Sequence, residues 1–170
     1  MKALSKGLLE FPILNTSIDD KCETIAYKSF HNIGIAVDTP NGLLVPNVKN
    51  VEKLSIQEIS KNIQRLQELG RSGKLTVKDL TGGTISISLL VFIGGVSGVP
   101  LILPPEVAII SMGRIQKLPR FDKDDNVIKT HMINFTWTAD HRIVDGATVA
   151  RCSNLMKKYL ENPELIMMDL

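Results

Sequence analysis

Apolar residues recur along the chain with two different periods, and these periods predict the order of its elements. Leu4, Leu8 and Leu9 give the first ten residues one apolar side, which indicates the last turns of an amphipathic helix that Pro12 stops. This stretch has neither the apolar region nor the cleavage site of a signal peptide. We therefore expect either a chain that begins inside a structural element or a natural short terminal helix.

The strongest helical period lies in residues 54–74. Ser55 and Glu58 have the spacing of a capping box, in which each side chain bonds the backbone N–H of the other residue. Gly70 or Gly73 is expected to end the helix, because glycine is common just beyond a helix C-terminus. The predicted buried stripe consists of Ile56, Ile59, Ile63 and Leu66.

Runs rich in β-branched residues predict strands, and the last run alternates apolar and polar positions. These runs occupy residues 23–29, 31–39, 43–48, 82–95, 104–115 and 127–141. Pro46 places its run at a sheet edge or a strand end, because proline cannot donate to a ladder. A second long helix is predicted from about Asp145 to Pro163. This order predicts an α+β fold in which helices cover one face of a mixed sheet.

Composition narrows the class of protein. Of the 170 residues 44% are apolar and the mean hydropathy is +0.09, so we expect a single domain over residues 1–170. A net charge of +2 is too small to indicate nucleic acid or an anionic membrane as a partner. No run approaches the roughly 18 apolar residues of a membrane helix. Cys22 and Cys152 lack paired or metal-ligand spacing, so we expect free thiols, no disulfide and no metal site.

The segment TWTADHRIVDGAT carries the candidate chemistry. His141 follows the last predicted strand, and Asp145 lies where the second long helix begins. Such a junction fixes the backbone on both sides and suits a positioned base. The residues alone leave two interpretations open. His141 is either a catalytic base or a surface group paired with Arg142, and Asp145 is an acceptable helix N-cap in both cases.

The stretch DHRIVDGA resembles the His-Arg-x-x-Asp-Gly signature of the dihydrolipoamide acyltransferases, the E2 cores of 2-oxo acid dehydrogenase complexes. A looser version of this signature marks chloramphenicol acetyltransferase. The resemblance extends over nearly the whole chain and is greatest to the E2 of the branched-chain complex. The further stretches, in the same order, are FPILNTSIDD, HNIGIAVDTPNGLLVPNVKNV, LTGGT, PPEVAI and ADHRIVDGATVARCSNLMKKYLENP.

The resemblance implies a chloramphenicol acetyltransferase-like fold and acyl transfer between the thiols of dihydrolipoamide and coenzyme A. It implies His141 as the base, Ser88 as hydrogen-bond donor to the oxyanion, and Asp145 as the residue that holds the active-site turn. A thiol pKa of about 8.5 lies some two units above that of histidine, so proton transfer is uphill by roughly 2.7 kcal/mol. The implied coenzyme A contacts are Asp38, Gln67, Ser88, Gly113 and Ile115.

The resemblance also implies partners and a location. The family forms trimers in which His141 of one chain would face Ser88 of its neighbour, and eight trimers build a hollow cubic core of 24 subunits. The implied lipoyl group is expected on a lipoyl domain outside this sequence, and the E1 and E3 components of the complex are the other implied partners. Location in the mitochondrial matrix follows by resemblance. The apolar segment 165–170 is expected to dock into a neighbouring trimer, or alternatively to fold back on its own subunit.

The sequence departs from the family pattern in two places. Leu89 and Val91 stand where an asparagine and a glycine are typical, and Phe92 stands where a small residue is expected. These bulky groups could narrow the coenzyme A channel. By the resemblance, we also expect the chain to lack the N-terminal strand and helix of the catalytic domain and the lipoyl and subunit-binding domains. Two alternatives therefore stay open: a truncated, catalytically impaired E2-like assembly or interaction subunit, and an O-acetyltransferase of the chloramphenicol type.

Overall fold

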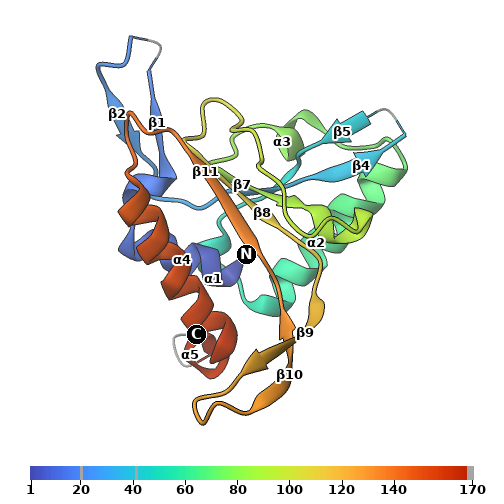
Figure 1. Ribbon diagram of the computed structural model, residues 1–170. Coiled ribbons are helices and arrows are strands. Elements are labelled where there is room, and N and C mark those ends of the chain that lie inside the picture. Colours follow the sequence, from blue (N-terminus) through green and yellow to red (C-terminus); the bar gives the residue numbers. More distant parts are fainter. Residues whose placement is uncertain (20, 41, 168–170) are drawn as a thin grey trace.

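A five-stranded sheet in the order β11-β8-β7-β3-β6 is the centre of the fold (Figure 1). The computed structural model describes residues 1–19, 21–40 and 42–167. β3, β7 and β8 run parallel to one another, whereas the edge strands β6 and β11 are antiparallel to their neighbours, which confirms a mixed sheet. The strands are β3 (Ile33–Ile35), β6 (Asn47–Val48), β7 (Ile85–Leu89), β8 (Ala108–Met112) and β11 (Phe135–Ala139). Pro46 directly precedes the edge strand β6, as predicted.

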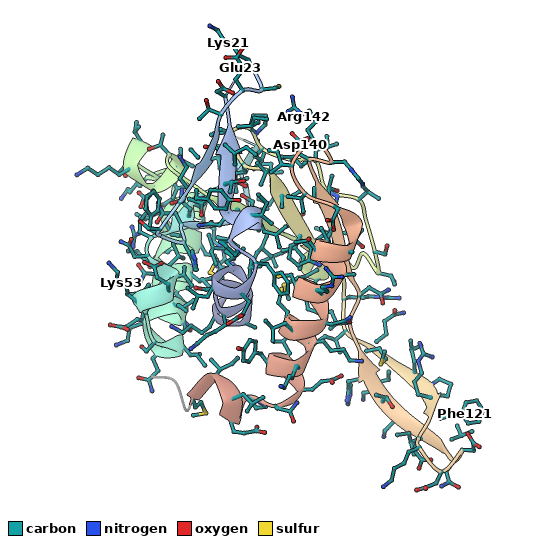
Figure 2. All side chains as sticks on the ribbon, turned by 90° about the vertical axis from the view of Figure 1, so that its left-hand side faces the viewer. Lys21, Glu23, Lys53, Phe121, Asp140 and Arg142 are labelled. Carbon is teal, nitrogen blue, oxygen red and sulfur yellow. The ribbon has the colours of Figure 1, made fainter. Side chains whose placement is uncertain are left out.

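Alternation along the central strands gives the sheet two different faces. Ile85 and Ile87 of β7 belong to the hydrophobic core, whereas Ser86 and Ser88 point to the opposite face. The core also contains buried side chains of the three long helices. These helices are α1 (Lys2–Glu10), α2 (Ile56–Arg71) and α4 (Gly146–Glu161), and Figure 2 shows all three on one side of the sheet. The predicted one-sided cover is confirmed.

Three antiparallel hairpins extend from this centre (Figure 1). Their strands are β1 (Thr16–Ile18) with β2 (Ile25–Tyr27), β4 (Val37–Thr39) with β5 (Gly42–Leu44), and β9 (Gln116–Phe121) with β10 (Val127–Met132). The short helical turns are η1 (Pro12–Asn15), η2 (Val51–Lys53), α3 (Val77–Leu80), η3 (Leu90–Ile93) and α5 (Glu164–Met167). Within the described residues no helix is both long and apolar enough to cross a membrane.

The predicted strand runs are interrupted where a strand changes its partner. The run 127–141 is not one strand, because β10 pairs with β9 and β11 pairs with β8. The run 31–39 divides in the same way into β3 and β4, which belong to different sheets. The run 82–95 ends at Leu89, after which the chain turns through η3 to Gly94, whose φ of +79° suits glycine.

The predicted caps are confirmed, whereas the predicted buried stripes are partly wrong. In α2 the Ser55 Oγ accepts from the Glu58 N–H at 3.2 Å, and Glu58 Oε2 accepts from the Ser55 N–H at 2.8 Å. Ile59 and Leu66 are buried, but Ile56 at the helix start is 46% exposed. Similarly, Leu4 and Leu8 of α1 are buried, while Leu9 is exposed. Each exposed residue lies beyond the arc of the helix that contacts the core.

A glycine sets the spacing between α1 and α4, which pack together beside the sheet. A Cβ on Gly7 would lie 2.9 Å from the sulfur of Cys152, closer than real Cβ contacts. Cys152 is fully buried in this contact, and burial raises the pKa of its thiol to about 12. Cys22 is exposed, and both cysteines are free thiols, as predicted.

Burial predicts opposite outcomes for two adjacent leucines of α1. Leu8→Ala should lower the free energy of unfolding by about 2–5 kcal/mol, because its side chain is 1% exposed and truncation leaves a cavity. Leu9→Ala should change it by no more than about 0.5 kcal/mol, because Leu9 is 58% exposed. Urea denaturation of both variants checks this, and equal losses would contradict the placement of α1.

Candidate active site

Parallel strands bring several predicted ligand residues to one end of the sheet. Ser88 pairs with Ser111 across β7 and β8, and Gly113 follows the end of β8. Asp38 lies in β4, directly after β3, and the intervening Ala36 N–H donates to the Ile87 carbonyl of β7. The carboxyl ends of parallel strands lie at the same edge of a sheet, where open α/β sheets bind ligands. Asp38, Ser88 and Gly113, with the exposed Ile115, therefore share one end of the sheet.

Gln67 joins this end through close packing of α2 on β4. A Cβ on Gly70 would lie 3.0 Å from Val37 Cγ1, so the helix approaches the strand where it has no side chain. A cavity of about 360 Å³ next to this contact is lined by Ala36, Val37, Asp38, Gln67 and Arg71. The structure thus brings Asp38 and Gln67 together. It adds Arg71, which the sequence analysis missed because a charged residue in the last turn of a helix usually indicates only a solvated end.

The Ser88 side chain lies half-buried on the face opposite the helices. Within the described part of the chain its hydroxyl has no hydrogen-bond partner, so it remains available to a ligand. The neighbouring Ser111 hydroxyl is buried and also without a partner among these residues. Leu89 packs against the hydrophobic core, on the face away from Ser88, so the obstruction expected from its bulk is not observed. The side chain of Phe92 lies outside the described parts of the structure.

His141 lies on a tight turn that backbone and side-chain contacts hold in place. The Asp140 N–H donates to the Val107 carbonyl at 2.8 Å, and the Asp140 carbonyl accepts from Ile143 and Val144. Arg142 forms an ion pair with Asp140, with 2.6 Å between Nη2 and Oδ2. Hydrogen bonds from Arg142 lower the pKa of Asp140. The His141 side chain is exposed, and among the described residues none forms a hydrogen bond with its ring.

Asp145 is the N-cap of α4, as the sequence suggested. Its Oδ1 accepts from the Thr148 N–H at 2.6 Å, and this backbone hydrogen bond lowers the pKa of Asp145. Arg142 forms its ion pair with Asp140 and not with Asp145. Arg142 also donates from Nη1 to the Cys22 sulfur at 2.8 Å, which joins the β1–β2 hairpin to the turn. Figure 2 shows Arg142 and Asp140 below the hairpin tip that carries Lys21 and Glu23.

Ser88 and His141 lie at opposite ends of the sheet within one chain. Thr136 of β11 is level with Ser111 and therefore with Ser88, whereas Ala139 pairs with Ala108 at the other end of β8. At about 3.3 Å per residue, Thr136 and Ala139 lie roughly 10 Å apart along β11, and His141 lies beyond Ala139. β8 also separates the two strands laterally. The two predicted catalytic groups of one chain are thus not in contact.

Glu106 is a half-buried residue on the Ser88 face that the sequence did not single out. Its Oε1 accepts from the Ser86 hydroxyl at 3.0 Å, and its Oε2 is buried without a partner in the described residues. Burial raises the pKa of Glu106 to about 7. It lines a cavity of about 480 Å³ beside Gly34 and Gly83, which leave room because they lack side chains. No group of His, Cys, Asp and Glu suited to a metal ion occurs among the described residues.

Residues 1–168 match the family described as 2-oxoacid dehydrogenases acyltransferase (catalytic domain). The chain is 56% identical over 170 residues to the mouse lipoamide acyltransferase component of the branched-chain alpha-keto acid dehydrogenase complex, mitochondrial. That alignment covers 100% of this chain but only 35% of the mouse protein. The chain therefore spans about a third of the length of this relative.

Solved structures give the same family and the same fold. The Azotobacter vinelandii dihydrolipoamide acetyltransferase, solved with enzymatic work on a serine, a histidine and an asparagine, is 31% identical with a TM-score of 0.92, over 98% of this chain and 68% of that chain. A structure described as the cubic core of the pyruvate dehydrogenase multienzyme complex has a TM-score of 0.90 at 31% identity, over 98% of this chain and 70% of that chain. Chloramphenicol acetyltransferase, at 11% identity and a TM-score of 0.54, shares the fold alone, which confirms the predicted fold class.

The raised pKa of Glu106 predicts a pH-dependent effect of its replacement. The folded chain retains the proton to about pH 7, whereas the unfolded chain loses it near 4.5. The contribution of the protonated Glu106 carboxyl to the free energy of unfolding is therefore fully present below about pH 4.5 and is lost as pH rises through 7. Glu106→Gln should match the wild type near the acid end and be more stable by on the order of 2–3 kcal/mol above pH 7. Urea denaturation across this range checks it, and a difference that does not grow with pH would contradict it.

Proposed function

The chain belongs to the 2-oxoacid dehydrogenase acyltransferase family, and we propose that it transfers a branched-chain acyl group between dihydrolipoamide and coenzyme A. The observation that carries this proposal is the division of the site within one chain. The ligand-facing residues around Ser88 gather at one end of the sheet, and the turn that bears His141 lies at the other. The name of the mouse relative supports the branched-chain substrate class and a mitochondrial location.

The proposed chemistry needs a base and an oxyanion donor, and no nucleophile from the chain. The imidazole of His141 takes the proton of the coenzyme A thiol, and the thiolate attacks the carbonyl of the acyl-dihydrolipoamide thioester. The oxygen of the tetrahedral intermediate then carries a negative charge, which the Ser88 hydroxyl stabilises as a hydrogen-bond donor. Collapse of the intermediate breaks the original C–S bond, and His141 returns its proton to the departing thiolate. The reverse direction uses the same groups.

The chain's own residues prepare these steps in different ways. The Asp140–Arg142 ion pair and the Asp145 cap hold the turn on both sides of His141, so that little freedom is lost when the base acts. Asp38, Gln67, Gly113 and Ile115 are proposed to bind coenzyme A at the end of the sheet where Ser88 lies. Neither Cys22 nor Cys152 has a role in the transfer.

Assembly is proposed to complete the site. A trimer would place His141 of one chain opposite Ser88 of its neighbour, and the likeness to a cubic core supports a larger particle of eight trimers. In the segment 165–170, Ile166 is buried within its own subunit, which favours folding back for that residue. Residues 168–170 lie outside the described residues. A lipoyl group on another domain, the E1 and E3 components and the mitochondrial matrix complete the proposed setting.

A second candidate function is a catalytically impaired E2-like assembly subunit. It is favoured by the apolar run that follows Ser88, in which Leu89 and Val91 stand where the family pattern has an amide and a glycine. Acyl transfer from 2-methylpropanoyl-CoA to dihydrolipoamide by the purified protein separates the two candidates, with chloramphenicol as the control acceptor. Transfer to dihydrolipoamide alone supports the proposed function. A folded trimer without transfer supports the impaired subunit, and transfer to chloramphenicol supports an O-acetyltransferase.

Removing either proposed catalytic group should lower turnover while the fold is retained. His141→Ala should reduce kcat by about 10²–10⁴, the usual effect of losing a positioned base. Ser88→Ala should reduce it by about 10²–10³, as expected for one oxyanion donor. Steady-state kinetics, with circular dichroism as the folding control, checks both values. Nearly normal turnover in a folded His141→Ala protein would exclude the mechanism.

Mixed assemblies test whether the site forms between chains. In trimers reassembled from equal amounts of the His141→Ala and Ser88→Ala chains, about a quarter of the interfaces would join an intact His141 to an intact Ser88. Activity should therefore recover to about a quarter of the wild-type value, although each variant alone is nearly inactive. Mixtures of the two separately assembled variants serve as the control. No recovery after reassembly would place both groups in the same chain.

A further inference from the structure

The C-terminal half of α2 carries a cation that the proposed mechanism does not use. Arg71 is exposed at the end of this helix, and within the described residues its guanidinium forms no ion pair or hydrogen bond. Together with Gln67 it lines the cavity of about 360 Å³ that contains Asp38, and also an adjoining cavity of about 530 Å³. The two cavities therefore form one groove along this side of the helix.

The charges in this groove make Arg71 decisive for an anionic ligand. The other ionisable groups that line the two cavities are Asp38 and Glu68, both acidic. Without Arg71 the groove would repel phosphate groups. With Arg71 it offers a planar set of N–H donors, which suits phosphate oxygens and binds them in pairs.

The position of the groove matches the far end of coenzyme A. The thiol end must reach Ser88 at the end of the sheet, whereas Arg71 lies on α2, beyond β4. The close contact at Gly70 holds this helix end against Val37, so the distance from the groove to the sheet is fixed by packing. An extended ligand that starts at Ser88 and passes Asp38 and Gln67 would present its phosphate-bearing end to Arg71.

We infer that Arg71 binds a phosphate group of coenzyme A and thereby selects the nucleotide-bearing thiol over simpler thiols. The inference rests on the proposed function, because it assigns a further residue to the same ligand. The phosphate is either the 3′-phosphate or the diphosphate, and the two sources share the same chemistry. The competing explanation is that Arg71 only stabilises the C-terminal end of the α2 dipole.

Calorimetric titration of the assembled protein with coenzyme A and with 3′-dephospho-coenzyme A tests the inference. Arg71→Gln should weaken coenzyme A binding by about 10–100-fold, the range expected for a hydrogen bond to a charged group. Arg71→Lys should recover part of this loss, because it keeps the charge but not the paired donors. Lys61→Gln removes an equal charge from an exposed position of the same helix outside the groove, and should leave the affinity within about twofold.

The pattern of losses identifies the phosphate. If Arg71 contacts the 3′-phosphate, the wild type prefers coenzyme A and Arg71→Gln loses this preference. If it contacts the diphosphate, Arg71→Gln weakens both ligands equally. Unchanged coenzyme A affinity in Arg71→Gln overturns the inference and leaves the proposed function intact. A loss of affinity in Lys61→Gln equal to that in Arg71→Gln has the same consequence. Absence of coenzyme A binding by the wild type overturns both.

Discussion

The antiparallel pairing of β11 with β8 is the constraint on which the rest of the site depends. β3, β7 and β8 are parallel, so their carboxyl ends share one edge, and Ser88 lies there. Because β11 runs the other way, it delivers His141 to the opposite edge. No side-chain rearrangement within a chain can undo a separation that the strand directions impose. A site that uses both residues must therefore be completed by a second chain.

A single alternation along β7 supports both the core and the site. Ile85 and Ile87 pack beneath the helices, and Ser86 and Ser88 face the other way. A shift of register by one residue would turn both serines toward the core and both isoleucines away from it, so the hydrophobic core fixes the direction of the proposed oxyanion donor. Glu106 lies on the same face, where its carboxyl accepts a hydrogen bond from Ser86. Above neutral pH this carboxyl is charged, and its charge lowers the stability of the folded chain.

Local signals in the sequence predicted local structure well. The capping box of α2 and the Asp145 cap were found because each depends on neighbouring residues alone. The boundary between β10 and β11 was not predicted, because apolar and polar residues continue to alternate where the chain changes from pairing with β9 to pairing with β8. The exposed Ile56, the Arg71 groove and the half-buried Glu106 were missed for a different reason. Each depends on an element that is distant in the sequence.

The tight contact between Gly7 and Cys152 affects how the Cys152 thiol can react with other sulfur groups. Thiol–disulfide exchange requires a thiolate that a second sulfur can reach. Burial denies both to Cys152, because it raises the pKa of the thiol to about 12 and leaves no exposed surface. Under the proposed function, the disulfide form of a substrate thiol could therefore meet this chain without attack by Cys152, which would release one of its sulfurs and retain the other as a mixed disulfide.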